Sequence, residues 1–293
     1  MPWIKLEFAC GPADAHALGD ALSEAGAAAV TLVDGGDQPV LEPAPGEVRL
    51  WDDTRVVGLF EADTDIAPVL AQMGTLLGAP PPAHRVEALE DRDWVRAWMD
   101  DYKPMSFGER LWIVPWHSEP PNPEAVNLRL DPGLAFGTGT HPTTALCLRW
   151  LDREDCARER VLDFGCGSGI LGIAALLLGA DHVDAVDIDP QALQATRDNA
   201  LRNGVADRIA ACAPDATPPE PADRVLANIL AKPLIELAPL LAAHCRVGGR
   251  IVLSGLLDSQ VESVRPCYEP WFDMDPPEIL DGWARLSGRR RPA

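Results

Sequence analysis

Residues 161–169 read Val-Leu-Asp-Phe-Gly-Cys-Gly-Ser-Gly, and an apolar helical pattern begins directly after them, at 170–179. A second acidic stretch, Val-Asp-Ala-Val-Asp-Ile-Asp-Pro, follows at 183–190. Strand, glycine-rich turn, helix and strand in this order predict the start of a nucleotide-type βαβ unit. Glycine lacks a Cβ, so the turn can be tight and its backbone can lie close to a ligand. Asp187, at the end of the second strand, places a carboxylate where it can accept both hydroxyls of a ribose.

The spacing of the glycines distinguishes between two kinds of cofactor. Dinucleotide folds use Gly-x-Gly-x-x-Gly, which would need glycine where this chain has Ile170. The Asp-x-Gly-x-Gly-x-Gly run that begins at Asp163 instead resembles the first motif of class I S-adenosylmethionine-dependent methyltransferases. Asp163 can attract the ammonium of a methionine moiety, directly or through water, beside Gly165 and Gly167. A glycine turn that only packs a helix on a strand would not require Asp187.

Composition limits the compartment and the partners. The chain has 293 residues, an apolar content of 47% and a formal net charge of −20. Such a surface disfavours direct phosphate-backbone binding and favours a basic partner, although a soluble acidic protein without a charged partner is equally compatible. The seven cysteines include no Cys-x-x-Cys pair and the histidines lack metal-ligand spacing, so we expect no disulfide framework and no metal.

Neither a signal peptide nor a membrane span is expected. Charge appears already at Lys5, and the longest apolar helix candidates are 169–180 and 230–245. The first is too short to cross a bilayer, and the second is interrupted by charged residues and proline. Together with the cysteine usage, these patterns predict a cytoplasmic protein.

The chain divides into two parts of different character. Alternating strand and helix patterns predict a small ferredoxin-like α+β domain at 1–90, with a role in substrate docking or stabilisation. A linker helix is expected at 91–104, where Trp94 and Trp98 share one face and favour core packing over ligand stacking. The third segment, 105–293, is predicted to be the cofactor-binding domain. The patterns of the first domain are strands at 3–10, 28–33 and 85–89, one or two strands at 47–60, and helices at 14–25 and 66–77.

The cofactor-binding domain is predicted to be a doubly wound α/β fold. Segments 110–116 and 126–130 resemble a hairpin that leads into it, and 271–288 can supply two more strands. Five strands separated by helices imply a parallel sheet that is covered on both faces. The strands are expected at 160–164, 182–188, 208–212, 223–227 and 249–254, and the helices at 170–179, 190–203, 231–244 and 258–269.

Three further segments belong to the expected site. The loop 136–144 is rich in glycine and hydroxyl groups, as a loop that closes over a cofactor should be, and it leads into a helix with Pro142 in its first turn. Thr140 or His141 would cap that helix, and His141 is either structural or a base. Asn228 follows the fourth strand, at the edge where ligands sit in open α/β sheets. Residues 213–216 can border the adenine.

The quoted motifs carry a family resemblance. Segments 130–144, 163–171, 187–190 and 227–231 resemble the bacterial ribosomal protein L11 methyltransferase (PrmA) family, a class I methyltransferase with a Rossmann-like doubly wound sheet. The resemblance implies methyl transfer from S-adenosylmethionine to lysine side chains and the N-terminal amine of that basic large-subunit protein. It further implies that the amino-terminal domain grips the substrate, and we separately expect a monomer. The cofactor contacts that we expect are Thr144, Gly165, Asp187, Asn228, Asp163 and Gly167, and Asn228 is the expected catalytic residue.

Three alternatives stay open. A methyltransferase of the same fold can act on RNA or on a small molecule, but the acidic charge and the absence of a Lys/Arg-rich patch disfavour RNA, and no sequence-specific nucleic-acid binding is expected. A cofactor-binding scaffold without catalysis is disfavoured by the intact Asp163, Asp187 and Asn228. A nicotinamide oxidoreductase is disfavoured by Ile170.

Overall fold

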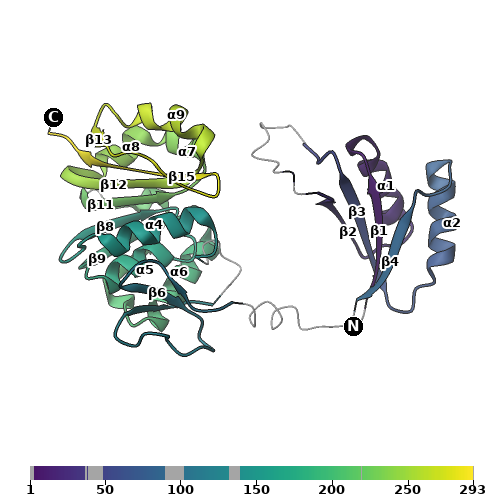
Figure 1. Ribbon diagram of the computed structural model, residues 1–293, viewed down its shortest axis with the longest axis horizontal. Coiled ribbons are helices and arrows are strands. Elements are labelled where there is room, and N and C mark those ends of the chain that lie inside the picture. The colour runs from purple at the N-terminus through teal and green to yellow at the C-terminus, as the bar shows by residue number, and fades with distance from the viewer. Residues whose placement is uncertain are drawn as a thin grey trace. The chain divides into compact units, whose positions relative to one another are not determined.

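The computed structural model describes residues 3–36, 38, 49–89, 102–131, 139–218 and 220–292, and Figure 1 labels its helices and strands. The chain divides into two compact units, Met1–Ala97 and Trp98–Ala293. Of the linker helix predicted at 91–104, residues 91–101 lie outside the described residues, and so do Trp94 and Trp98. Within the described ranges, no helix is long and apolar enough to cross a membrane.

The first unit is a four-stranded antiparallel sheet with the order β2-β3-β1-β4, and it confirms the ferredoxin-like prediction. Of the one or two strands predicted at 47–60, the described residues form one, Thr54–Glu61, and 47–48 lie outside the described residues. The elements are β1 (Trp3–Cys10), α1 (Pro12–Glu24), β2 (Ala29–Asp34), β3 (Thr54–Glu61), α2 (Ile66–Leu77) and β4 (His84–Leu89).

Alternation along the strands gives this unit its own core. Leu6 and Phe8 point to one face of β1 and are buried there together with Phe60 of β3 and Met73 of α2. Both helices therefore cover the same face of the sheet. On the other face Glu7 pairs with Lys5, 2.6 Å away, and this hydrogen-bonded partner lowers the pKa of Glu7.

The second unit begins with a three-stranded sheet, and here the predicted hairpin is wrong. Strands β6 (Leu111–Val114) and β7 (Val126–Arg129) pair in parallel, whereas β6 is antiparallel to β5 (Met105–Ser106). The connection at 115–125 is long enough to carry the chain back to the start of β6, and parallel pairing requires such a return. The guanidinium of Arg129 stabilises this return by donating to the carbonyl of Pro115, 3.0 Å away.

The main sheet has the order β10-β9-β8-β11-β12-β15-β13, with β14 paired to β15. The five predicted parallel strands are confirmed, and β8 lies between β9 and β11, which makes it the point where the strand order reverses. The strands are β8 (Arg160–Phe164), β9 (His182–Val186), β10 (Ile209–Cys212), β11 (Ala222–Asn228), β12 (Cys245–Leu257), β13 (Phe272–Met274), β14 (Glu278–Leu280) and β15 (Trp283–Arg290).

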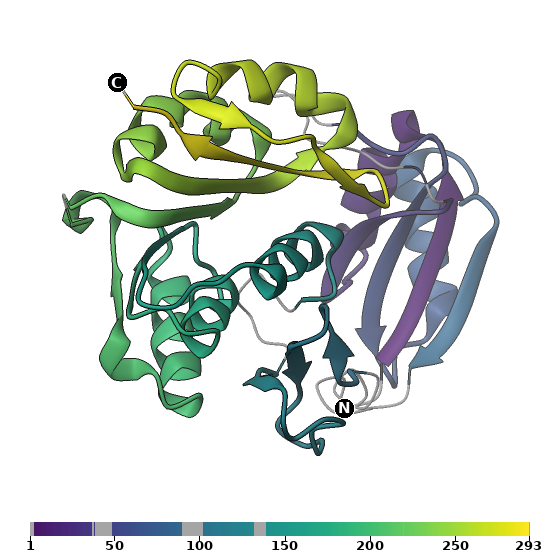
Figure 2. The ribbon, with the colours of Figure 1, turned by 60° about the vertical axis from the view of Figure 1, so that its left-hand side comes forward.

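Helices cover both faces of this sheet, as predicted. Leu226 and Val252 face one core with α4, α5 and α6, and Val225 and Ile251 face the other core with α7, α8 and α9. Figure 2 shows the last strands between the yellow-green helices of the chain's end and the teal helix α4. The helices are α4 (Pro142–Arg153), α5 (Ile170–Leu177), α6 (Pro190–Arg202), α7 (Ala231–Glu236), α8 (Ala238–Ala243) and α9 (Val261–Val264).

Three predicted elements differ in detail. The helix expected at 231–244 is two helices, because Pro239 has no N–H to continue the ladder. The helix expected at 258–269 is the single turn of α9 between two 3-10 turns. The segment at 271–288 forms three strands instead of two, because the left-handed residues Asp281 and Gly282 (φ 49° and 77°) close a tight hairpin between β14 and β15.

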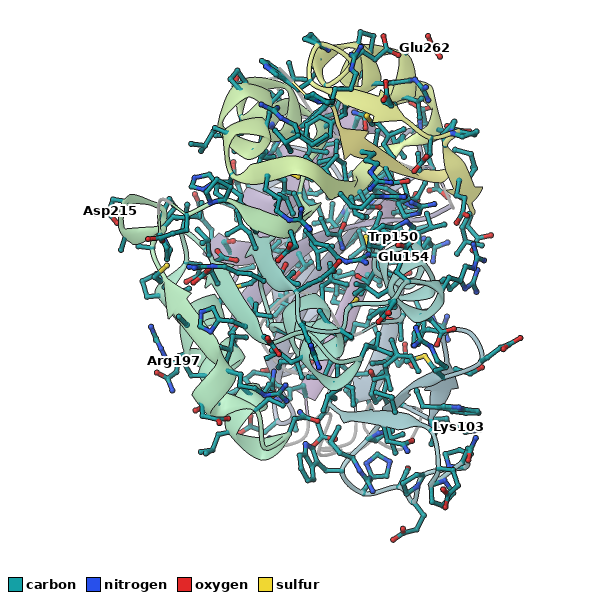
Figure 3. The ribbon with its side chains drawn as sticks, turned by 90° about the vertical axis from the view of Figure 1, so that its left-hand side faces the viewer. Lys103, Trp150, Glu154, Arg197, Asp215 and Glu262 are labelled. Atoms are coloured by element: carbon teal, nitrogen blue, oxygen red, sulfur yellow. The ribbon has the colours of Figure 1, made fainter. Side chains whose placement is uncertain are left out.

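The last turn of α4 is anchored to the sheet by a buried arginine. Arg224 of β11 pairs with Glu154, 3.2 Å away, and its guanidinium lies 5.0 Å from the ring centre of Trp150. Figure 3 labels Trp150 and Glu154, whose side chains lie next to each other. A guanidinium over an indole ring is attracted by the ring's negative face. This anchor holds α4, whose first turn carries Thr144.

Candidate active site

The glycine-rich turn between β8 and α5 has the backbone that its sequence predicts. Gly165, Gly167 and Gly169 have φ of 76°, 55° and 79°, in the left-handed region that favours glycine. A Cβ at Gly165 would lie 2.2 Å from Cγ2 of Ile229. A side chain at this position would therefore displace Ile229, the residue that directly follows β11. The three glycines therefore serve a tight turn at the carboxyl edge of the sheet.

Asp187 lies next to this turn, as its position after β9 predicts. Its Oδ2 accepts a hydrogen bond from the backbone N–H of Gly167 at 2.9 Å, and Oδ1 accepts one from the N–H of Asp189 at 3.0 Å. The side chain is half-buried. Two backbone donors hold the carboxylate in place while each oxygen retains a lone pair for a further donor.

Asp163, unlike the half-buried Asp187, is fully buried. It is 1% exposed, and its Oδ2 accepts the N–H of Gly172, in the first turn of α5, at 2.9 Å. Burial raises the pKa of Asp163 to about 7, the Gly172 hydrogen bond opposes this shift, and the charge of Asp187 adds to it. Asp163 thus joins the end of β8 to the start of α5, directly beneath the turn.

Asn228 and Thr144 meet on the other side of β8. The Nδ2 group of Asn228, the last residue of β11, donates to Oγ1 of Thr144 at 3.3 Å. Thr144 is 2% exposed in the first turn of α4. These two expected site residues are brought together from distant parts of the sequence, at the same edge of the sheet as the glycine turn.

His141 caps α4, so the structure supports one of the two expected capping residues. Its Nδ1 lies 2.8 Å from Oγ1 of Thr143 and 3.4 Å from the N–H of the same residue. Burial lowers the pKa of His141. Its ring meets Trp283 edge-on, with 4.7 Å between the ring centres. A neutral imidazole and an indole therefore lie together at this edge, where β15 begins.

Sequence reasoning missed Trp283 and Ile188. Trp283 reaches the site on an antiparallel strand, and no motif connects it with His141. Ile188 stands between Asp187 and Asp189, and its side chain is 85% exposed. Its position directly after the strand-end carboxylate is a signal that could have identified it. It adds an exposed apolar surface beside Asp187.

The remaining predicted segments are only partly visible. In the loop at 136–144, residues 136–138 lie outside the described residues, and Gly139 has φ of 88°. The segment at 213–216 forms a 3-10 turn (Pro214–Ala216) after β10. The N–H of Asp187 donates to the carbonyl of Cys212 at 3.3 Å, so this segment starts beside the candidate ribose site. The described ranges contain no group of three or more potential metal ligands.

Comparisons with known proteins agree on one family. A family model described as ribosomal protein L11 methyltransferase (PrmA) matches residues 2–291. The ribosomal protein L11 methyltransferase of Marinobacter nauticus is 57% identical over 297 residues, covering 99% of this chain and 99% of that protein. Its counterpart in Ectopseudomonas mendocina is 55% identical over 293 residues, covering 99% of this chain and 100% of that protein.

A solved structure extends the comparison to three dimensions. The crystal structure of a ribosomal protein L11 methylase from Lactobacillus delbrueckii subsp. bulgaricus gives a TM-score of 0.60 at 34% sequence identity. The match covers 65% of this chain and 100% of that one. With a family model over nearly the whole sequence and relatives above half identity, this chain belongs to the ribosomal protein L11 methyltransferase family.

Proposed function

We propose that this protein transfers methyl groups from S-adenosylmethionine to lysine side chains and the N-terminal amine of ribosomal protein L11. The observation that carries the proposal is that two hydrogen-bonded pairs of residues lie at the same edge of the sheet. On one side of β8 the Asp187 carboxylate holds the Gly167 N–H, and on the other side Asn228 holds Thr144. The names of the close relatives support the substrate.

The first pair suits the cofactor. Asp187 has the acceptor capacity for two ribose hydroxyls, and Ile188 supplies an apolar surface for adenine. Gly165 and Gly167 let the backbone approach the methionine part closely, and Asp163 lies beneath it. Bound there, S-adenosylmethionine would supply an electrophilic methyl group on a good leaving group, so the chain's own task is to align the acceptor.

The second pair suits the acceptor amine. Because Nδ2 of Asn228 donates to Thr144, its carbonyl oxygen is the half of the amide that would accept an N–H of the incoming amine. This would orient the nitrogen lone pair. Burial lowers the pKa of His141, so its ring is neutral at pH 7 and adds no charge that would repel an approaching ammonium.

The charge and the two units suit a protein substrate. A net charge of −20 attracts a basic partner. We assign substrate recognition to residues 1–90, a linking role to 91–104 and catalysis to 105–293. We further propose a monomer that acts in the cytoplasm, where the seven cysteines, all free in this structure, stay reduced.

The test uses purified protein, S-adenosylmethionine with a labelled methyl group, and three acceptors offered separately: L11, a mixture of the other large-subunit proteins, and naked ribosomal RNA. We expect label on L11 alone, with mass spectrometry locating it on lysines and the N-terminal amine. Label on RNA, or on carboxyl or hydroxyl groups of L11, would contradict the proposal.

A further inference from the structure

One side of helix α6 carries polar residues where an apolar packing face is usual. Thr196 and Asn199 lie one turn apart, and Asn203 directly follows the helix as its C-cap. Thr196 is completely buried, and both asparagines are half-buried. Arg197, by contrast, is exposed, and Figure 3 shows it projecting outward from α6. Buried polar groups require partners, and each of these three residues finds them on another segment.

Two of these residues bind the glycine-rich turn. The hydroxyl of Thr196 lies 3.1 Å from the carbonyl oxygen of Gly167 and 3.3 Å from the sulfur of Cys166. Nδ2 of Asn199 donates to the carbonyl of Ser168 at 2.9 Å. Gly167 is therefore held from both sides, because Asp187 accepts its N–H and Thr196 binds its carbonyl. The turn is fixed by α6 as well as by its own backbone.

The third residue connects the same helix to the small sheet. Oδ1 of Asn203 accepts the N–H of Arg129 at 2.8 Å, and Nδ2 donates to the carbonyl of Arg129 at 2.8 Å. Asn203 thus pairs with the end of β7 as a neighbouring strand would. The same Nδ2 lies 2.8 Å from the carbonyl of Asn199, which joins the two asparagines.

We infer that Thr196, Asn199 and Asn203 are positioning residues for the cofactor. They hold the glycine turn in the conformation in which the Gly167 N–H meets Asp187, and they tie that turn to the end of β7. A turn built from left-handed glycines has a large conformational freedom when nothing restrains it. By removing that freedom before binding, α6 lowers the entropy cost of ordering the turn around a ligand. This inference rests on the proposed function, because it concerns the same site.

The test replaces hydrogen-bond donors without changing side-chain shape. Asn199→Asp and Thr196→Val are isosteric and lack the donor, whereas Thr196→Ser keeps the hydroxyl. Gln194→Ala, on the exposed side of α6, is the control, since the Gln194 amide donates to the exposed Asp198 on the same helix. The readouts are the Kd of S-adenosylhomocysteine by calorimetry and the KM for S-adenosylmethionine and kcat with L11.

We expect Asn199→Asp and Thr196→Val to raise Kd and KM about fivefold, with kcat within about twofold of the wild type, because a typical net hydrogen bond is worth about 1 kcal/mol and that energy corresponds to about a fivefold change in Kd. Thr196→Ser and the control should bind like the wild type. Unchanged Kd in both isosteric variants, even with a lowered Tm, would reduce these residues to structural ones and overturn the inference.

Failure of the inference about α6 can be distinguished from failure of the proposed function. If Asn199→Asp does not fold, the comparison of Thr196→Val with Thr196→Ser still tests the inference, because only Thr196→Val loses the hydroxyl donor. If the wild-type protein itself does not bind S-adenosylhomocysteine, the proposed function fails, and the inference about α6 fails with it. Wild-type binding together with unaltered variants overturns the inference alone.

Discussion

Asn228 donates a hydrogen bond from Nδ2 to Oγ1 of Thr144, 3.3 Å away, across 84 positions of sequence. The bond joins the end of a central strand to the first turn of α4. Because Nδ2 is the donor of this bond, the carbonyl oxygen is the half of the Asn228 amide to which the proposed function assigns the acceptor amine. Thr144 is buried, so the bond is shielded from competing water and orients the amide firmly.

Replacing Asn228 should affect turnover more than cofactor affinity. We expect Asn228→Ala to lower kcat about 100-fold, because misplacing the reacting amine is costly, and to change the Kd of S-adenosylhomocysteine little. Thr144→Val should produce a smaller fall in kcat, and Thr144→Ser should restore it. Steady-state kinetics and calorimetry on the three variants check this. A loss confined to cofactor affinity would make Asn228 a binding residue only.

Removing the Asp187 carboxylate should weaken the cofactor. Asp187→Ala is expected to cost about 1–3 kcal/mol of S-adenosylhomocysteine binding, since hydrogen bonds to a charged acceptor are lost. Asp207→Ala, an exposed acid at the other end of β10, is the matched control and should bind normally. The measurement is calorimetry at fixed salt. Equal affinities for the two variants would remove Asp187 from the site.

Burial of Asp163 should make stability depend on pH. Its pKa is raised to about 7 in the folded protein, against about 4 in the unfolded chain. Between these values the folded state binds more protons than the unfolded state, so this group's contribution to the free energy of unfolding falls as pH rises from about 4 to 7.

Asp163→Asn removes this titration. The free energy of unfolding of the wild type minus that of the variant should therefore decrease between about pH 4 and 7 and level off above it. Urea unfolding at a series of pH values gives the difference. A difference that stays constant across the range would show that Asp163 is ionised throughout.

Turnover should rise with pH between about 7 and 9. The acceptor must lose its proton, and an unperturbed lysine has a pKa of about 10.4, against about 8 for an N-terminal amine. The pKa of His141 is lowered by burial, so its titration lies below this window. Site-resolved mass spectrometry at saturating cofactor should show the N-terminal amine methylated at lower pH than lysines. A flat profile for lysine would place the slow step at docking or product release.

The two units should be separable in function. Each has its own hydrophobic core, so a fragment of residues 98–293 is expected to fold and to bind S-adenosylhomocysteine like the full chain. Its kcat/KM with L11 should fall at least about tenfold, because the unit assigned to docking is gone. Comparison of both proteins on L11 and on a short lysine peptide checks this. Full activity of the fragment on L11 would exclude a docking role for residues 1–90.

Much of the fold was predictable because its signals are local. Buried parallel strands read as short apolar runs, and the glycine turn and the strand-end Asp187 follow from the geometry of a βαβ unit. Gly165 and Gly167 have the left-handed backbone that their spacing indicates. Pro142 likewise indicated where α4 begins, and of the two capping residues expected there, Thr140 and His141, the structure has His141 as the N-cap. In each case neighbours in sequence determine the structure.

Other features depend on pairings between segments that are remote in sequence. The parallel pairing of β6 and β7, the contact of Trp283 with His141 and the bond from Asn199 to the glycine turn have no local signature. Residue periodicity reports which side of an element is buried, and it does not report which other element covers that side. The sequence by itself determined the α/β sheet, the turn and its acidic partner. Only the packing of α4 and α6 on the sheet decided how Thr144, Asn228 and the turn are held, because contacts between segments remote in sequence form only in the folded chain.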